Sequence, residues 1–324
     1  MTDHSHANGE RFRAAGAVLA LAAVGLAYEV ALTRLFSLIF QYHYVFLIVS
    51  LAVLGLGVGA AIGHLTRRRA ADAALGGVAI ALGVGLIGVA AALAAMRSAD
   101  RVTLAAGLGL LPFVALGWLN ATIFARYAVY SALLYGADLF GAVLGLLGAL
   151  ALVETVGAFG SVLALASVAA LAAALLAWRS ARGLAAGAGL LAAFGVGLAF
   201  SGTVEYDPAR LQDAPPDKTM THVLQDPSAD AEVLDTRWST FARVDLVRIA
   251  DEGLRYVFTD AGAGSVMVRY DPANPGEAAW LEANADNLPF AIAPQPESVL
   301  ILGAGAGKHV IQAPLAGAGS ATPP

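Results

Sequence analysis

The chain has 324 residues, of which 58% are hydrophobic and only 13% carry a charge. Soluble domains carry roughly a quarter charged residues, so this composition is typical of a protein that faces lipid. The chain has no cysteine, which excludes disulfides, thiolate zinc sites, iron–sulfur clusters and cysteine nucleophiles.

Charge divides the chain into two parts near Ser201. Residues 1–200 hold 11 basic and 7 acidic residues, a net charge of +4, whereas residues 201–324 hold 8 and 17, a net charge of −9. Nucleic acid is excluded as a partner of the acidic part, because phosphate binding needs a basic face. The expected partner of the apolar part is the lipid bilayer.

The apolar part predicts about seven transmembrane helices after a polar tail at residues 1–13. A helix needs about 20 apolar residues to cross the hydrocarbon core. Seven stretches in residues 14–200 satisfy this length, and short polar segments separate them; they are 14–40, 44–65, 73–96, 102–125, 131–155, 160–178 and 184–200. The predicted fold is therefore mainly α, a polytopic transmembrane helical bundle.

Glycines recur at four-residue spacing within two of these stretches. They are Gly55, Gly59 and Gly63, and Gly141 with Gly145. Such glycines let helix backbones approach closely, within one chain or in a homo-oligomer. The alternative is that glycine is simply common in membrane helices.

The arginine distribution predicts the orientation in the membrane. With a cytoplasmic N-terminus, the cytoplasmic segments hold eight arginines and the outer loops hold only Arg97 and Arg101. Positive residues favour the cytoplasmic side, so we expect a multi-pass protein of the cell inner (plasma) membrane. Seven spans then place residues 201–324 on the outer side. The eight cytoplasmic residues are Arg11, Arg13, Arg67, Arg68, Arg69, Arg126, Arg179 and Arg182.

Ionisable residues also occur inside the predicted spans. Glu29 and Arg34 lie in the first span and Asp138 lies in the fifth. Charge at membrane depth is unfavourable unless it is paired or hydrated, so we expect these three side chains to face the bundle interior. Two interpretations stay open: a buried ion pair that fixes helix packing, or a transport pathway.

The polar part divides into three segments. Residues 201–235 are rich in Asp, Pro and Ala and predict a linker or a partly ordered connector. Residues 236–297 predict a small β-rich region, with strands from Arg243 to Ile249, at 254–259 and at 265–269, and with a helix at 277–288. Residues 298–324 predict the start of a Rossmann-like α/β domain.

That last segment carries the most informative motif. A continuous apolar run at 298–302 predicts a buried parallel strand, and Gly303, Gly305 and Gly307 follow at once. Glycines there permit a tight turn and let the backbone approach a cofactor, before a helix near 307–316. The alternative is a glycine-rich turn without a ligand. We interpret His309 as a surface residue, and we expect no metal.

Four segments together resemble one family, the bacterial membrane proteins in which a multi-span region is fused to a spermidine synthase-like domain. The segments are Ala27–Val30 with Thr33 and Arg34, Tyr135–Ala142, Trp238–Val247 with Tyr256–Asp260, and Val299–Gly307. The resemblance implies that an aminopropyl group is transferred from decarboxylated S-adenosylmethionine to a small amine. It also implies that Gly303, Gly305 and Gly307 hold that cofactor or S-adenosylmethionine.

The sequence also departs from this family. Phe241 and Ala242 stand where the family often has Tyr-Gln, and Asn287–Phe290 stand where it has Tyr-His-Glu. The acidic residue that would hold the ribose and the catalytic Asp are not found before Pro324. We therefore expect a truncated or degenerate member, inactive or incomplete, whose residues 201–324 bind the cofactor weakly or not at all. The alternatives are an S-adenosylmethionine-dependent methyltransferase-like membrane protein, and a non-enzymatic transporter-like or scaffolding one.

Overall fold

The computed structural model describes residues 2–66, 72–250, 254–271, 273–283, 285–319 and 321–322. Within these residues the chain has six helices that are long and apolar enough to cross a membrane. Their bounds lie within a few residues of the predicted spans, except that the first helix begins inside the predicted polar tail. They are α1 (Thr2–Ile39), α2 (Val45–Thr66), α3 (Asp72–Ala94), α4 (Val102–Arg126), α5 (Ser131–Ala177) and α6 (Arg182–Ser201).

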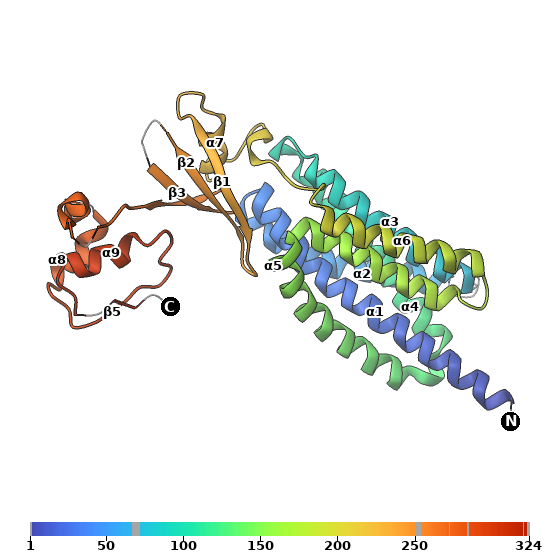
Figure 1. Cartoon of the computed structure of the whole chain (residues 1–324). Coiled ribbons are helices and arrows are strands. Elements are labelled where there is room, and N and C mark those ends of the chain that lie inside the picture. The colour runs from blue at the N-terminus through green and yellow to red at the C-terminus, as the bar shows by residue number, and fades with distance from the viewer. Residues whose placement is uncertain are drawn as a thin grey trace. The chain divides into compact units, whose positions relative to one another are not determined.

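The longest helix, α5, contains two of the predicted spans and reverses its direction between them. Its backbone leaves helical geometry at Gly157, where φ is 72° and ψ is 175°. The first half runs parallel to α1, because Gly141 lies against Leu19 and Gly145 against Ala23. The second half runs antiparallel to α1, because Leu175 contacts Gly16 and Arg179 contacts Gly9 (Figure 1). The six helices thus supply seven membrane-length segments.

Contacts at the two ends of the bundle agree with seven segments. At one end, Glu10, Arg126 and Arg179 line the same cavity, so the start of α1 and the ends of α4 and α5 lie together. At the other end, the backbone N–H of Gln212, which follows α6, donates to the carbonyl of Arg97 between α3 and α4 (2.6 Å). The arginines predicted to share one side of a membrane therefore share one end of the bundle where they are described. Arg67, Arg68 and Arg69 lie outside the described residues.

Glycine brings helix backbones into direct contact at every predicted position. A Cβ atom on Gly59 would collide with the backbone of Val114 in α4, and one on Gly145 would collide with Ala23 in α1. Gly55, Gly63 and Gly141 are enclosed in the same way, whereas Gly57, Gly136 and Gly148 face open space. The spaced glycines therefore serve close packing inside one chain. A homo-oligomer through such helices stays a prediction.

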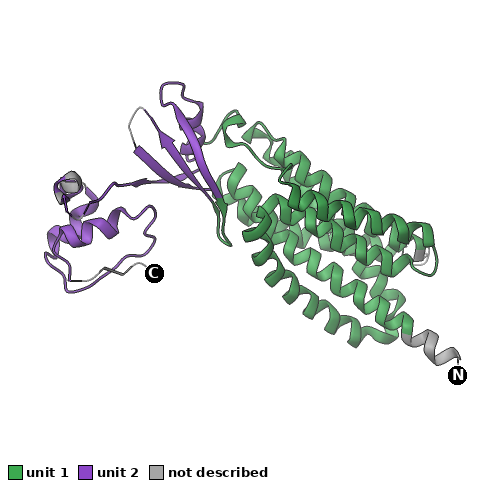
Figure 2. Ribbon diagram, in the orientation of Figure 1, with its two compact units in different colours: residues 1–215, 237–243 green, residues 216–236, 244–324 purple. Residues whose placement is uncertain are grey.

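The chain divides into two compact units, shown in green and purple in Figure 2. The first contains residues 1–215 and 237–243, and the second contains residues 216–236 and 244–324. The second unit carries most of a four-stranded antiparallel sheet, in the order β1-β2-β3-β4. The strands are β1 (Ala231–Trp238), β2 (Arg243–Ile249), β3 (Leu254–Thr259) and β4 (Ala263–Met267).

The predicted hairpin is confirmed, with Val244 paired to Thr259 and Ile249 to Leu254. Its turn at residues 251–253 lies outside the described residues. The third predicted strand, at 265–269, is β4, shifted by two residues. Val247, Ile249 and Phe258 lie on the buried face of this sheet together with Asp245, which is also buried.

Two other parts of this region contain different elements from those expected. The expected linker at 201–235 contains η5 (Pro208–Arg210), α7 (Thr219–Gln225) and most of β1. Strand β1 escaped prediction because its side chains are largely exposed on both faces, so no apolar alternation marks it. The helix expected at 277–288 is instead two 3₁₀ segments, η6 (Pro275–Ala283) and η7 (Ala285–Asn287), followed by α8 (Leu288–Ile292).

The N-terminal end of α7, with Lys218 before it, stabilises the turn between β3 and β4. Asp260 and Ala261 hold the left-handed conformation, with φ of 48° and 57°. The buried amino group of Lys218 donates to the carbonyl of Asp260 (2.8 Å), and the N–H of Met220 donates to that of Ala261 (3.1 Å). Burial lowers the pKa of Lys218, although Asp260 and Asp217 oppose this shift. These contacts compensate for a backbone that non-glycine residues rarely adopt.

Candidate functional site

The glycine turn lies between a short strand and a helix, as predicted. Strand β5 (Val299–Leu300) precedes it and α9 (Lys308–Leu315) follows it. After α9, β6 (Ala321–Thr322) pairs with β5 in parallel. The chain therefore forms a strand–turn–helix–strand unit whose two strands, of two residues each, are parallel.

All three predicted glycines adopt a conformation that favours glycine. Their φ values are 70° at Gly303, 56° at Gly305 and 88° at Gly307. A Cβ atom on Gly303 or Gly307 would meet nothing within 4 Å, so only the backbone angle requires glycine there. At Gly305, a Cβ atom would also lie 2.7 Å from the Ser265 hydroxyl oxygen. Gly305 thus permits both the turn and a close contact.

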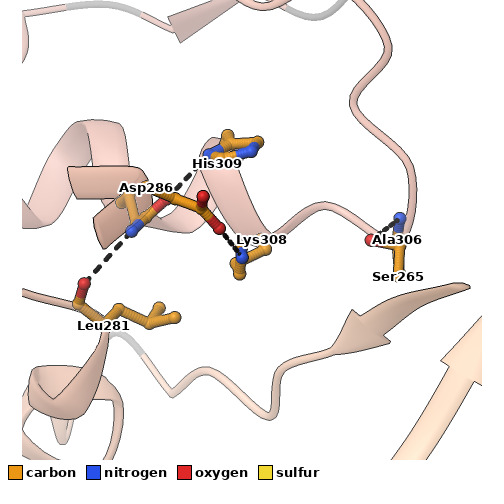
Figure 3. Close-up of polar contacts among 7 residues, drawn as sticks. Ser265, Leu281, Asp286, Ala306, Lys308 and His309 are labelled. Atoms are coloured by element: carbon orange, nitrogen blue, oxygen red, sulfur yellow. Dashed lines mark hydrogen bonds and ion pairs between the residues drawn. The ribbon is translucent and has the colours of Figure 1, made fainter. Parts of the chain in front are cut away.

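Ser265 of β4 is the residue that approaches the turn. Its hydroxyl oxygen accepts a hydrogen bond from the backbone N–H of Ala306 (3.1 Å; Figure 3). One donor of the turn is therefore already bound to protein. Ser265 could not be found from the sequence, because it comes from a strand about 40 residues away with no motif around it.

A charged pair adjoins the turn on its helical side. The amino group of Lys308, the first residue of α9, donates to the carboxylate of Asp286 in η7 (Figure 3). This hydrogen bond and the charge of Lys308 lower the pKa of Asp286. Asp286 is thus a carboxylate that stays ionised and is a weak proton acceptor.

The rest of α9 docks on η6 through Gln312. The buried Gln312 side chain donates from Nε2 to the carbonyl of Leu281 (3.1 Å). Its Oε1 lies 2.8 Å from Nδ1 of His309 (Figure 3). His309 is partly exposed, and its ring lies within hydrogen-bond distance of Gln312.

The strand before the turn differs from prediction in its burial. Ile301 is buried, but Leu300 is 69% exposed and Leu302 is 79% exposed. A strand inside a parallel sheet would be covered on both faces. Among the described residues, β5 has only β6 as a neighbour, which leaves these leucines uncovered.

The three intramembrane residues do not form one site. Gly141 lies beside Leu19, so Asp138 lies near the level of Gly16, 13 residues or roughly 20 Å along α1 from Glu29. All three side chains are half-buried rather than directed fully inward. Among the described residues, neither Glu29 nor Asp138 has a hydrogen-bond or ion-pair partner, so the interpretation as a buried ion pair was wrong.

Arg34 instead binds the tip of the β1–β2 hairpin. Its Nη1 donates to the carbonyl oxygen of Phe241 (2.6 Å), within the first unit. The ring of Trp238 at the same tip lies against Gly157, where α5 reverses. Arg243 of β2 donates to the carbonyl of Tyr206 (2.8 Å). Arg34 is thus a structural contact between a transmembrane helix and this hairpin tip.

Within the described ranges, no group of three or more His, Asp or Glu side chains could hold a metal ion. Comparisons with models of protein families, with curated proteins and with solved structures found no match to this chain. Any assignment of function therefore depends on the local geometry and on the residues described above.

Proposed function

We propose that this chain is a membrane-anchored, spermidine synthase-like protein that binds S-adenosylmethionine, or its decarboxylated form, at the turn of residues 303–307. The observation that supports this most is the β5–turn–α9–β6 unit, in which three left-handed glycines separate parallel strands. In such units the backbone of the turn contacts the cofactor directly, because no side chain intervenes.

In the family that the chain resembles, the chemistry is attack of an amine on the carbon beside a sulfonium. The amine must lose a proton to a carboxylate, and the sulfur leaves as a neutral thioether. Asp286 is the carboxylate beside the turn, but Lys308 lowers its pKa and makes it a weak base. The described residues of the turn therefore support cofactor binding, and we assign no proton acceptor.

Cofactor binding can be tested on the full chain in detergent. Ligand-observed saturation-transfer NMR suits weak binding, which we expect because the described turn is open around Gly303 and Gly307. Signals from S-adenosylmethionine or its decarboxylated form should vanish in Gly303→Ala. The matched control is Gly202→Ala, which strains a similar φ of 63° after α6 and should leave the signals unchanged. Absence of signals from the unaltered chain would argue for the non-enzymatic scaffolding alternative.

Turnover distinguishes the two transferase alternatives. Decarboxylated S-adenosylmethionine with a polyamine should give methylthioadenosine if the aminopropyl interpretation holds. S-adenosylmethionine giving S-adenosylhomocysteine would instead favour the methyltransferase alternative. The glycine turn serves both chemistries, so it does not choose between them.

The side of the membrane is a second test. The arginine bias puts the Arg97 end of the bundle, where residues 201–215 continue, on the outer side, whereas S-adenosylmethionine is cytoplasmic. Because the chain lacks cysteine, Arg97→Cys and Arg182→Cys can each be labelled alone on intact cells. Cofactor use requires that an impermeant reagent spares Arg97→Cys. Rapid labelling of that variant would confirm the charge bias and contradict the cofactor proposal.

A further inference from the structure

A basic cavity lies at the end of the bundle that holds the N-terminal part of α1. It has a volume of about 390 Å³ and lies among α1, the end of α4 and the end of α5. Its polar wall has three arginines and one acid, and its apolar wall has two leucines and an alanine. The lining residues are Glu10, Arg13, Ala14, Arg126, Tyr127, Leu175, Leu176 and Arg179.

The charges of this cavity are unbalanced. Glu10 Oε1 lies 4.0 Å from Arg13 Nη2 and 3.9 Å from Arg179 Nη1, so one carboxylate is shared by two guanidinium groups at the outer limit of ion pairing. Arg13 and Arg179 together therefore carry one more charge than the carboxylate that they share. Arg13 is held in place, because its Nε also donates to the carbonyl of Gly9 (3.2 Å).

We propose that this cavity binds a phosphate group. Guanidinium groups match phosphate oxygens in charge and in their paired donors, and a cavity in which two guanidinium groups share one distant carboxylate suits a phosphate anion. Two sources carry this chemistry: the headgroup of an anionic phospholipid, and free inorganic phosphate. The cavity lies at the ends of transmembrane helices, where lipid headgroups are found, and Leu175 and Leu176 offer a surface for an acyl chain.

The test uses the delipidated full chain in neutral detergent. Native mass spectrometry would count retained phosphatidylglycerol, with phosphatidylcholine as the zwitterionic comparison, and inorganic phosphate would be added in a separate arm. Arg13→Gln with Arg179→Gln should weaken phosphatidylglycerol binding roughly 25-fold, since each arginine near a headgroup contributes about fivefold. The matched control, Arg97→Gln with Arg101→Gln, makes the same charge change at the other end and should have little effect.

Glu10→Gln keeps the proposal testable if the double variant does not fold. Removing the shared carboxylate releases Arg13 and Arg179, so binding should become several-fold tighter. Competition by millimolar inorganic phosphate would identify free phosphate as a source, and its absence would identify the lipid; both outcomes support a phosphate site. Equal affinity for phosphatidylcholine, equal weakening in the control, or no gain in Glu10→Gln would overturn it.

Discussion

The guanidinium group of Arg34, near the end of α1, donates a hydrogen bond to the backbone carbonyl of Phe241, 207 residues later in the chain. Because the acceptor is a main-chain atom, the contact depends on Arg34 and not on the identity of residue 241. The Phe241 side chain is 78% exposed. A change of the Phe241 side chain should therefore leave the hydrogen bond intact, whereas a change of Arg34 removes it.

Arg34→Leu should loosen the tip of the β1–β2 hairpin. The lost hydrogen bond is worth about 1 kcal/mol, since one partner is charged but the site is partly exposed. Amide hydrogen exchange at residues 239–242 should become faster, while exchange in α4 should not change. Phe241→Ala keeps the acceptor and is the control. If both variants exchange alike, the hydrogen bond does not hold the tip.

The reversal of α5 should depend on Gly157. An alanine there would strain a φ of 72°, and its Cβ would lie 2.7 Å from Nε1 of Trp238. With ψ of 175°, this backbone region is nearly restricted to glycine and costs about 1–3 kcal/mol in other residues, and the ring must also move. Gly157→Ala should therefore lower the thermal midpoint and shift tryptophan emission. Gly148→Ala, on the open face of the same helix, should do neither.

Close packing of α2 on α4 should depend on Gly59. Gly59→Ala places a methyl group against the backbone of Val114, which cannot move without displacing the helix. We expect a loss of about 2 kcal/mol in thermal or denaturant unfolding, typical of overpacking. Gly57→Ala, two residues earlier in the same helix, meets open space and should be neutral. Equal effects would mean that glycine matters here only through helix propensity.

Features that depend on local sequence patterns could be predicted. Span bounds, the spaced glycines and the β2–β3 hairpin all follow from local patterns. Contacts made by isolated polar groups could not be predicted, because nothing in the sequence beside Arg34 specifies Phe241, and nothing beside Gly305 specifies Ser265. Strand β1 could not be predicted because both its faces are exposed, so its sequence lacks the usual alternation of apolar and polar residues.

Acid should weaken the contact between Lys308 and Asp286. Lys308 holds the pKa of Asp286 below its usual range, so the pair stabilises the fold above about pH 4, the pKa of Asp in an unfolded chain. That contribution is lost as the pH falls through the lower folded-state pKa. The thermal midpoint of Lys308→Met should thus be lower than wild type at pH 6 and approach it in acid. The thermal midpoint of Asp286→Asn should be lowered by the same amount at pH 6. The midpoint of the double variant should be no lower than that of either single variant.

The stability of the cofactor-free chain should depend on Gly305. Ser265 occupies the space that a Cβ at residue 305 would need, with its own Cβ at 3.0 Å and its hydroxyl at 2.7 Å. Gly305→Ala should therefore destabilise the cofactor-free chain, by about 1–2 kcal/mol for the φ of 56° and by more for the contact. Gly303→Ala has the same backbone strain but no contact, so the difference in unfolding free energy between the two variants measures the contact. Ser265→Gly should rescue Gly305→Ala in part, because it removes both nearby atoms, and should not rescue Gly303→Ala. Equal destabilisation of the two glycine variants, with no rescue, would show that Ser265 does not pack on the turn and that only the backbone conformation requires glycine.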